Sequence, residues 1–254
     1  MESGGDILRL EKVSFQSEYL GCLREVSFSL FPGENLVVFG PENSGTEAIC
    51  PVIAGLEEEF EGEIYYRGRP VRPFDYFEKL NYRKELGYLQ KNYGLINNMS
   101  VEENISLPLQ YHSRLDATEV RAEVDRFIEE LRLEHCRHRR PVALTAAETL
   151  KTAFCRAIAL DPRLLLVEHS LEGQCLLNAL GYLETLEKWA RRNNKSVIFV
   201  TYEPERFVEF SDKFIMLYDG RTVFEGNRAE FVAENDPYLS QYRRSLTVGP
   251  MKVL

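Results

Sequence analysis

A glycine-containing loop between a predicted strand and a predicted helix is the first feature of this sequence that could do chemistry. The stretch FGPENSGTEAIC, Phe39–Cys50, follows the apolar run LVVF and precedes a helical pattern. Such a loop can cradle a phosphate, because its backbone N–H groups and the positive end of the helix dipole point at the anion. A working phosphate loop also has a lysine followed by a hydroxyl, and here Thr46 and Glu47 stand at those positions.

Acidic side chains surround the place where a phosphate would bind. Glu42 and Glu47 bring two carboxylates there, and no cation accompanies them in the loop. At an effective dielectric of ~20, two unit charges about 4 Å apart differ by several kcal/mol between attraction and repulsion. That difference abolishes ordinary micromolar binding, so we predict a loop that excludes polyphosphate. Glu47 also suits the first turn of a helix, where the dipole stabilises a carboxylate, so the protein supplies its own anion.

The elements around the loop predict a parallel α/β sheet. Continuous apolar runs predict buried strands at LVVF, at Arg163–Glu168 and at Ser196–Thr201. Alternating patterns predict an antiparallel arm in the first third of the chain and a closing hairpin over Lys213–Gly226. Helical periodicity begins near Ser100, where Glu103 completes capping-box spacing. The predicted helices are Ala117–Leu133, Leu144–Asp161 and Leu176–Arg192.

The composition limits the class of protein. The 254 residues, 44% hydrophobic and 28% charged, are typical of a globular chain with a sizeable core. The net charge of −9 argues against wide contact with nucleic acid, which needs a positive face. No apolar run approaches the ~18 residues of a membrane span, and MESGGDILRL lacks the features of a secretory signal. Any membrane role is therefore expected to come through a partner.

Cysteine usage predicts neither disulfides nor a metal centre. Five scattered cysteines without a CxxC pair are typical of reduced thiols in a cytosolic protein. The segment EHCRH, Glu134–His138, gathers possible metal ligands, but no second ligand cluster completes a site. A solvated, mixed-charge helix end explains this segment, and we predict no bound metal.

Segments spread along the sequence resemble, in order, the nucleotide-binding subunit of ABC transporters over almost the whole chain. PGENLVVFGPENSG and VIAGLEEEFEGEI are similar to the phosphate loop and the stretch after it. ELGYLQKNYGLINNMSVEENI resembles the Q-loop region, LTAAETLKTAFCRAIALDPRLLLVEHS the signature helix with the Walker B strand, and VIFVTYEPERF the H-loop. The resemblance implies a P-loop NTPase-like (RecA-like) α/β core with a mostly parallel sheet, an N-terminal antiparallel β arm and a helical subdomain.

The resemblance also implies a division of the chain and a setting in the cell. One ABC-type domain would span residues 1–254, with the core at about 1–90 and 150–226, the helical subdomain at about 91–149 and a tail at 227–254. Such a subunit is expected to dock on an integral membrane permease and to pair with a second nucleotide-binding subunit, identical or different. It would lie in the cytoplasm, peripheral at the inner face of the cell membrane.

The tail, NRAEFVAENDPYLSQYRRSLTVGPM, narrows the resemblance. It looks like the C-terminal arm of the Mla/Mce-type lipid-transport branch, in which an Asp-Pro, a Gln-aromatic and a Gly-Pro pair recur. These pairs are Asp236–Pro237, Gln241–Tyr242 and Gly249–Pro250 here. A generic amphipathic tail is the alternative.

The two motifs that hold phosphate and Mg²⁺ depart from the family pattern at their active positions. The resemblance places the degenerate phosphate loop at Gly40, Asn43, Ser44, Gly45, Thr46 and Glu47. Thr46 replaces the lysine, Glu47 replaces the Mg²⁺-binding hydroxyl, and Asn43 replaces a glycine. Val167 replaces the aspartate that orients Mg²⁺. Glu168 matches the catalytic base, but without lysine or metal we expect its role to be structural.

The signature, which is LSGGQ in the family, is LTAAE in this chain. Ala146 and Ala147 put methyl groups where glycines let backbone amides approach a γ-phosphate. Thr145 and Glu148 have capping-box spacing, and a plain helix cap is the interpretation that we favour.

The remaining motifs are altered or ambiguous. Tyr202 stands at the H-loop histidine. Lys91 stands at the Q-loop glutamine, unless a slip of one residue restores Gln90. Phe15 and Tyr19 lie near the expected adenine-stacking aromatic, where Tyr19 is a possible stacker and a buried or surface aromatic is the commoner role.

Three functions are compatible with these residues. The first is a pseudoenzyme that folds, dimerises and docks on a permease without binding ATP, and it needs no cofactor. The second is an atypical ATPase in which Glu47 ligates Mg²⁺ and Glu168 acts as base, so that ATP and Mg²⁺ would be its cofactors. The third is a soluble regulator without a permease. We favour the first, because the altered motifs are lost together.

Overall fold

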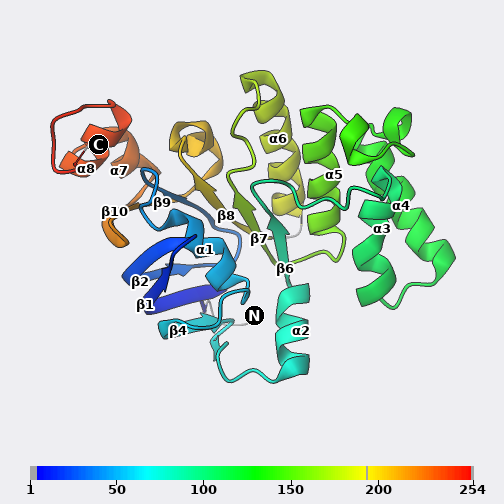
Figure 1. Cartoon of the computed structure of the whole chain (residues 1–254), viewed down its shortest axis with the longest axis horizontal. Coiled ribbons are helices and arrows are strands. Elements are labelled where there is room, and N and C mark those ends of the chain that lie inside the picture. The colour runs from blue at the N-terminus through cyan, green and yellow to red at the C-terminus, as the bar shows by residue number, and fades with distance from the viewer. Residues whose placement is uncertain (1–4, 193, 253–254) are drawn as a thin grey trace.

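A computed structural model describes residues 5–192 and 194–252 of the chain, without the side chain of residue 176 (Figure 1). The strands are β1 (Leu8–Ser17), β2 (Gly21–Leu30), β3 (Asn35–Phe39), β4 (Glu61–Tyr66), β5 (Arg69–Pro70), β6 (Leu86–Leu89), β7 (Leu164–Glu168), β8 (Ser196–Thr201), β9 (Lys213–Tyr218) and β10 (Arg221–Asn227). The helices are α1 (Thr46–Ile53), α2 (Tyr76–Lys84), α3 (Val101–His112), α4 (Ala117–Leu131), α5 (Ala146–Ile158), α6 (Leu176–Arg192), α7 (Arg228–Ala233) and α8 (Pro237–Arg243). Short 3-10 turns are η1 (Glu134–Cys136), η2 (Pro141–Ala143) and η3 (Pro204–Phe210).

The central sheet has six strands in the order β10-β9-β3-β8-β7-β6. Its pairings are parallel except for the closing hairpin β9–β10, as the sequence predicts. The apolar runs form its middle, and every residue of β8 is buried. Parallel strands are covered by helices on both faces, which is why their sequences are apolar without alternation.

A second sheet, β2-β1-β4-β5, is antiparallel and forms the predicted N-terminal arm. The α/β fold with a mostly parallel sheet, an antiparallel arm and helical segments is therefore confirmed.

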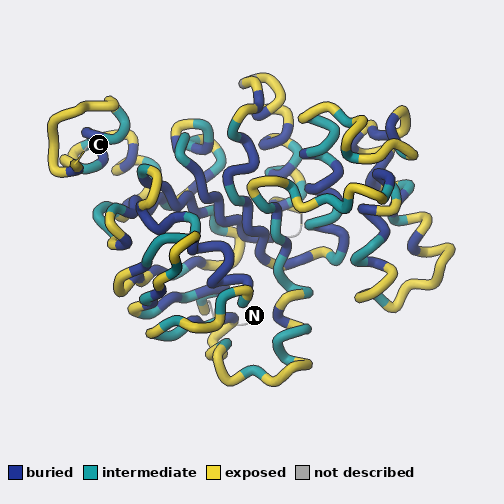
Figure 2. The backbone as a smooth tube through the Cα atoms, viewed as in Figure 1, coloured by how far each residue is buried: buried dark blue, intermediate teal, exposed yellow. Residues whose placement is uncertain are grey.

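Two hydrophobic clusters lie on the two faces of the central sheet, and β3 contributes to both. Leu36 and Val38 pack with the antiparallel arm and α1, whereas Val37 and Phe39 pack with the larger helical layer. Successive side chains of a strand point to opposite faces, so β3 contributes to both cores, and β7, β8 and β9 do the same. Figure 2 shows the buried residues concentrated along these central strands.

The helices begin where the caps predict and end where the backbone turns. Ser100 caps α3 and is capped in return by Glu103, the capping box predicted from their spacing. The helix predicted over Ala117–Leu133 ends at Leu131, because Arg132 adopts a left-handed conformation that closes it. Helix α2 was not predicted, although Asp75 and Glu78 form another capping box at its start.

Helices α3, α4 and α5 gather at one end of the molecule, and the tail helices α7 and α8 lie at the other (Figure 1). Among the described residues, no helix is long and apolar enough to cross a membrane.

The tail is folded onto a single buried amide. Gln241 is 2% exposed, and its side chain accepts a hydrogen bond from the Met251 N–H at 2.7 Å and donates to the Met251 carbonyl at 2.9 Å. A methyl group on Gly249 would lie 2.3 Å from the Gln241 Oε1 atom, so only glycine fits there. Gln241 and Gly249 therefore fold the segment 249–251 back against α8.

We predict that Gln241→Ala lowers the free energy of unfolding by about 1–3 kcal/mol, because it leaves the buried Met251 groups without a partner. Denaturant unfolding measures this change. Gln110→Ala, which removes an exposed amide on α3, is the control and should change stability by less than about 0.5 kcal/mol. Equal effects of the two variants would show that the Gln241 contacts do not stabilise the tail.

Candidate functional site

The loop between β3 and α1 has the close backbone approach that its glycines require. A Cβ atom on Gly40 would lie 2.2 Å from the Leu217 carbonyl oxygen, and one on Gly45 would lie 2.1 Å from the Cys22 carbonyl oxygen. Asn43, at the position of a family glycine, has a φ of +62°, a left-handed conformation that asparagine tolerates better than most residues. The shape of the loop is compatible with this sequence even though its charged side chains differ.

The carboxylate of Glu47 is held by hydroxyl groups. Tyr202 donates its phenol hydrogen to Glu47 Oε1 at 2.6 Å, and the buried Thr46 hydroxyl lies 3.3 Å from Glu47 Oε2. Burial, and then the bond to Glu47, raise the pKa of Tyr202 above its ordinary value, so the phenol keeps its proton at neutral pH. Glu47 and Tyr202, predicted from the sequence to stand at the Mg²⁺-binding hydroxyl and at the H-loop histidine, thus bind each other.

Lys91 is the cation that the structure brings to this pair. Its Nζ lies 5.5 Å from the centre of the Tyr202 ring, over the face of the ring rather than beside the Glu47 carboxylate. Gln90 lies directly after β6. Its Oε1 is 2.7 Å from where a Cβ on Gly94 would be, so its side chain packs against that backbone.

Glu168 ends β7 and is bound from the neighbouring strand. Tyr88 of β6 donates its hydroxyl hydrogen to Glu168 Oε2 at 2.7 Å, and the Lys91 backbone N–H lies 3.5 Å from the same oxygen. Burial raises the pKa of the nearby Cys50 thiol, and the negative charge of Glu168 raises it further. Val167, at the position of the Mg²⁺-orienting aspartate, is buried in the larger hydrophobic cluster.

Two residues that were not among the predicted site residues complete this region. His169 is buried, has a left-handed φ of +46° and places its ring 4.2 Å from the Tyr202 ring. Its Nδ1 contacts Glu172. The hydroxyl of Tyr242 lies 2.7 Å from the Tyr202 carbonyl oxygen and 3.0 Å from that of Gly40, so its proton is shared between them. Tyr242 lies 202 residues after Gly40, and the sequence contained no signal for this contact.

The signature position forms a helix cap, as its spacing predicts. Thr145 caps α5, and the Glu148 carboxylate accepts a hydrogen bond from the Thr145 N–H at 2.7 Å. Ala146 is exposed and Ala147 is half-buried at this helix start. Helix α5 packs in the larger hydrophobic cluster and α1 in the other one. Figure 1 shows the two helices apart, so the signature segment does not reach the loop of the same chain.

The two aromatic residues considered for adenine stacking differ in burial. Phe15 belongs to the core beneath the antiparallel arm, whereas Tyr19 is 91% exposed. Only Tyr19 presents a ring that a ligand or partner could contact.

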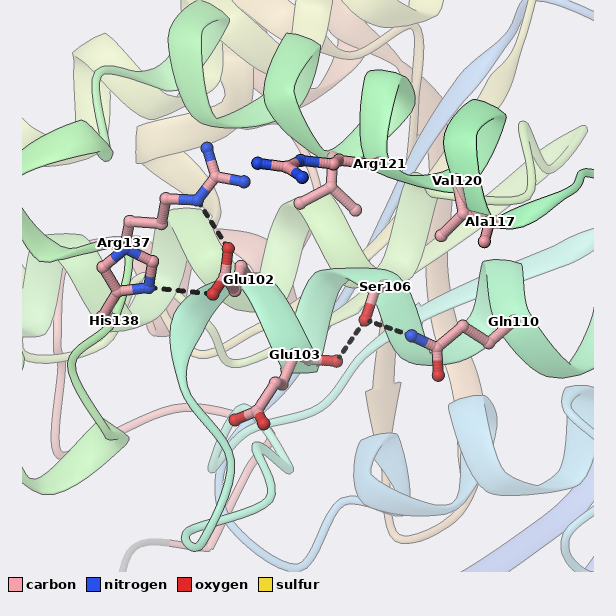
Figure 3. A pocket seen from close by; sticks show the side chains of 10 residues that line it. Glu102, Glu103, Ser106, Gln110, Ala117, Val120, Arg121, Arg137 and His138 are labelled. Carbon is pink, nitrogen blue, oxygen red and sulfur yellow. Dashed lines mark hydrogen bonds and ion pairs between the residues drawn. The ribbon is translucent and has the colours of Figure 1, made fainter.

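A hollow of about 580 Å³ lies away from the loop, between α3 and α4 (Figure 3). Glu102 at its wall binds Arg137 Nε at 2.5 Å and His138 Nδ1 at 2.8 Å. Arg137 also pairs with Asp125 at 2.6 Å. Glu102, Arg137 and His138 are thus engaged with one another at the wall of the hollow.

Comparison with known proteins gives one family and many relatives. The family profile described as ABC transporter matches residues 23–169. The chain is 28% identical to the molybdate/tungstate import ATP-binding protein WtpC of Thermococcus kodakarensis, over 80% of this chain and 60% of that protein. It is 26% identical to the sulfate/thiosulfate import ATP-binding protein CysA of Mesorhizobium japonicum, over 97% of this chain and 71% of that protein. The match thus spans only about 60% of the length of WtpC.

Solved structures share the fold. The chain is similar to cbiO1 of Clostridium perfringens, part of the ABC transporter complex cbiONQ, with a TM-score of 0.80, 17% identity and coverage of 95% of this chain and 94% of that one. It is also similar to a dimeric ATP-binding cassette in a post-hydrolysis state bound to ADP and Pi, with a TM-score of 0.78 and 23% identity. That match covers 87% of this chain and 98% of the other.

We predict that Tyr202→Phe lowers the free energy of unfolding by about 1–3 kcal/mol at neutral pH, because the half-buried Glu47 carboxylate loses its phenol donor. Folding raises the pKa of Tyr202, so the contribution is complete below pH ~10 and is lost as the pH rises through the folded value. Denaturant unfolding of Tyr202→Phe, Glu47→Gln and the double variant isolates the pair.

The control for this cycle is Tyr111→Phe, which removes an exposed phenol on α3. It should leave stability unchanged within about 0.5 kcal/mol. Additive effects of the Tyr202 and Glu47 substitutions would contradict a direct bond.

Proposed function

The chain belongs to the ABC transporter family, and we propose that it is an ATP-binding-type subunit that no longer binds or hydrolyses ATP. Instead, it serves a membrane permease as a structural or regulatory partner. The observation that carries this proposal is the Tyr202–Glu47 hydrogen bond of 2.6 Å at the start of α1. A side-chain carboxylate of the protein lies beside the loop that would otherwise receive a phosphate.

Electrostatics supports exclusion of the nucleotide. A triphosphate would have to approach the Glu47 carboxylate and the exposed Glu42 without the lysine that normally compensates its charge. Displacing Glu47 would also break its bond to Tyr202 and leave that phenol without its acceptor. Both costs oppose binding.

The oxygen atoms near the loop are a poor set for Mg²⁺. Mg²⁺ prefers near-octahedral coordination by oxygens, usually carboxylates, phosphates and water. Glu47 already accepts from Tyr202 and contacts Thr46, and Glu168 accepts from Tyr88. Val167 contributes no oxygen from its side chain. The atypical ATPase would need Glu47 and Glu168 to leave these partners, so we place it second.

A groove beside the sheet edge supports docking on a permease. It has a volume of about 500 Å³ between β6, α3 and α5, and most of its lining is apolar or aromatic. Its walls include Leu107, Pro108 and Tyr111 of α3, and Tyr111 is 74% exposed. An apolar groove next to a helix suits an amphipathic helix of a partner. In this proposal the helical subdomain, about residues 91–149, meets the permease at the inner face of the membrane.

The proposed division of the chain into a core and a tail follows from the family resemblance, as does its pairing. The core would comprise about residues 1–90 and 150–226, with a tail at 227–254, and the subunit would pair with a second nucleotide-binding subunit, identical or different. A homodimer would contain two altered sites. In a heterodimer, the intact partner's phosphate loop would still face LTAAE of this chain.

Two substrate classes are candidates for transport, lipids and oxyanions. Only the sequence of the tail suggests lipid transport, and the residues of the tail make local structural contacts. Asp236 caps α8 through the N–H groups of Tyr238 and Leu239, and Gln241 holds Met251. The relatives above are named for import of molybdate, tungstate, sulfate and thiosulfate instead. Identification of the co-purifying permease decides between these substrates.

We predict that the purified chain shows no Mg·ATP binding at millimolar nucleotide in isothermal titration calorimetry. The double variant Thr46→Lys/Glu47→Thr restores the lysine and hydroxyl and should gain at least tenfold in affinity over the wild type, from the Coulomb difference of several kcal/mol. Thr118→Lys/Glu119→Thr makes the same exchange at the start of α4 and is the matched control. Micromolar binding by the wild type would overturn the pseudoenzyme and favour the atypical ATPase.

We predict that the affinity-tagged chain brings a multi-span membrane protein with it from detergent-solubilised native membranes. Tyr111→Glu should weaken that complex about tenfold or more, because it places a charge where an apolar anchor would be buried. Tyr76→Glu on α2 changes a tyrosine of the same 74% exposure and should have no effect. Recovery of the wild-type chain as a free monomer would favour the soluble regulator.

A further inference from the structure

Three side chains with metal-ligand atoms meet at the junction of η1 and α5. His135 and Cys136 belong to η1, and Glu148 belongs to the first turn of α5. The Nε2, Sγ and carboxylate oxygen atoms of these residues all lie within 4.8 Å of one another. Cys136 and Glu148 are 12 residues apart in sequence. The fold therefore completes a cluster of ligands that the segment EHCRH alone leaves incomplete.

The cluster is open on one side and closed on the other. Cys136 is fully buried, the Glu148 side chain is 14% exposed and the His135 side chain is 58% exposed. An ion could therefore enter between the imidazole and the carboxylate and reach the sulfur below them. The Cys136 thiol contributes only a weak hydrogen bond, to the Leu133 carbonyl oxygen at 3.3 Å, so a metal would displace little.

The two oxygens of Glu148 have separate tasks. Oε2 accepts from the Thr145 N–H and keeps the cap of α5. Oε1 lies 2.5 Å from His135 Nε2, on the side that faces the imidazole. One carboxylate can thus hold the helix start and ligate an ion at once.

We propose that His135, Cys136 and Glu148 form a binding site for a zinc-like divalent cation. Zinc binds imidazole nitrogen, thiolate sulfur and carboxylate oxygen at ~2.0–2.3 Å, and a three-ligand site leaves its fourth tetrahedral position for water. Binding replaces the thiol S–H bond by a sulfur–metal bond and releases the proton to solvent. The exposed imidazole can make the small movement that opens its contact with Glu148 to tetrahedral spacing.

The surroundings select a soft, thiolate-binding ion rather than Mg²⁺ or Ca²⁺. Hard cations need several oxygen ligands, whereas this cluster offers one carboxylate oxygen beside a nitrogen and a sulfur. Arg137 and His138 are turned to Glu102, as Figure 3 shows, and leave the cluster to the other residues. A bound ion would tie the start of α5 to η1 and fix the LTAAE segment in place.

Titration of the metal-free full-length chain with zinc chloride, in competition with a chromophoric chelator, tests the site. We expect one zinc ion per chain. Loss of one of three ligands should weaken binding by at least about tenfold, because loss of an outer-shell partner alone costs that much. We therefore expect this loss in His135→Ala, Cys136→Ser and Glu148→Gln, and glutamine can still complete the cap.

Two matched controls each remove one possible metal ligand outside the cluster, either a neighbouring imidazole or an exposed thiol. His138→Ala deletes the other imidazole of EHCRH, and Cys175→Ser deletes an exposed thiol, and both should bind zinc as the wild type does. Cobalt substitution reports on the sulfur directly, through a thiolate-to-cobalt charge-transfer band that Cys136→Ser should abolish. The proposal is overturned if the wild type lacks that band, or if His135→Ala binds zinc unchanged. The cobalt band of the wild type and the zinc affinity of His135→Ala test the proposal even if a Cys136 variant fails to fold.

Discussion

The phenol of Tyr202 and the carboxylate of Glu47 meet where two neighbouring parallel strands end. Phe39, the last residue of β3, pairs with Thr201, the last residue of β8, so whatever follows these strands shares one edge of the sheet. In open α/β sheets, this carboxyl edge is where ligands bind. Here the protein places a hydrogen bond between two of its own side chains across that edge. The tail joins the same point, because Tyr242 bridges the carbonyls of Gly40 and Tyr202.

Residues of the predicted motifs are accommodated locally by the fold. Asn43 adopts a left-handed conformation, Tyr88 binds Glu168, and Glu148 completes the capping box of α5. Buried polar groups are costly when they are unpaired and roughly neutral when they are paired. A site that loses its ligand therefore keeps a stable fold only if its polar groups find partners within the protein. This pairing is the physical basis of the proposed scaffold role.

The two ends of the molecule are then suited to different contacts. The tail packs on the core through the Phe231 ring, which stacks on Phe214 at 4.2 Å, and through the Tyr242 hydroxyl. The opposite end carries the apolar groove beside α3 and the His135–Cys136–Glu148 cluster. A subunit that takes no energy from ATP can still hold a partner in place through such surfaces, provided that its core is rigid. The two hydrophobic clusters on β3 supply that rigidity.

Local rules in the sequence determined the elements. Apolar runs without alternation predicted β3, β7 and β8, and side-chain caps predicted the starts of α3 and α5, because these signals depend on neighbours within a few residues. The missing lysine at Thr46 and the acid at Glu47 could also be read directly from the order of residues. Helix α2 begins with the same kind of cap but was not predicted.

Only the tertiary structure decided which side chains meet. Tyr202 and Glu47 are 155 residues apart, and Tyr242 and Gly40 are 202 apart. Sequence spacing does not encode such contacts, since they depend on how the sheet orders its strands and where the tail returns. The contact of Glu148 with His135 and Cys136 also depends on the tertiary structure. In the sequence, His135 and Cys136 belong to a segment of possible metal ligands, whereas Glu148 belongs to a helix cap. Local residue types thus determined what each segment could form, and packing determined which chemistry these residues could share.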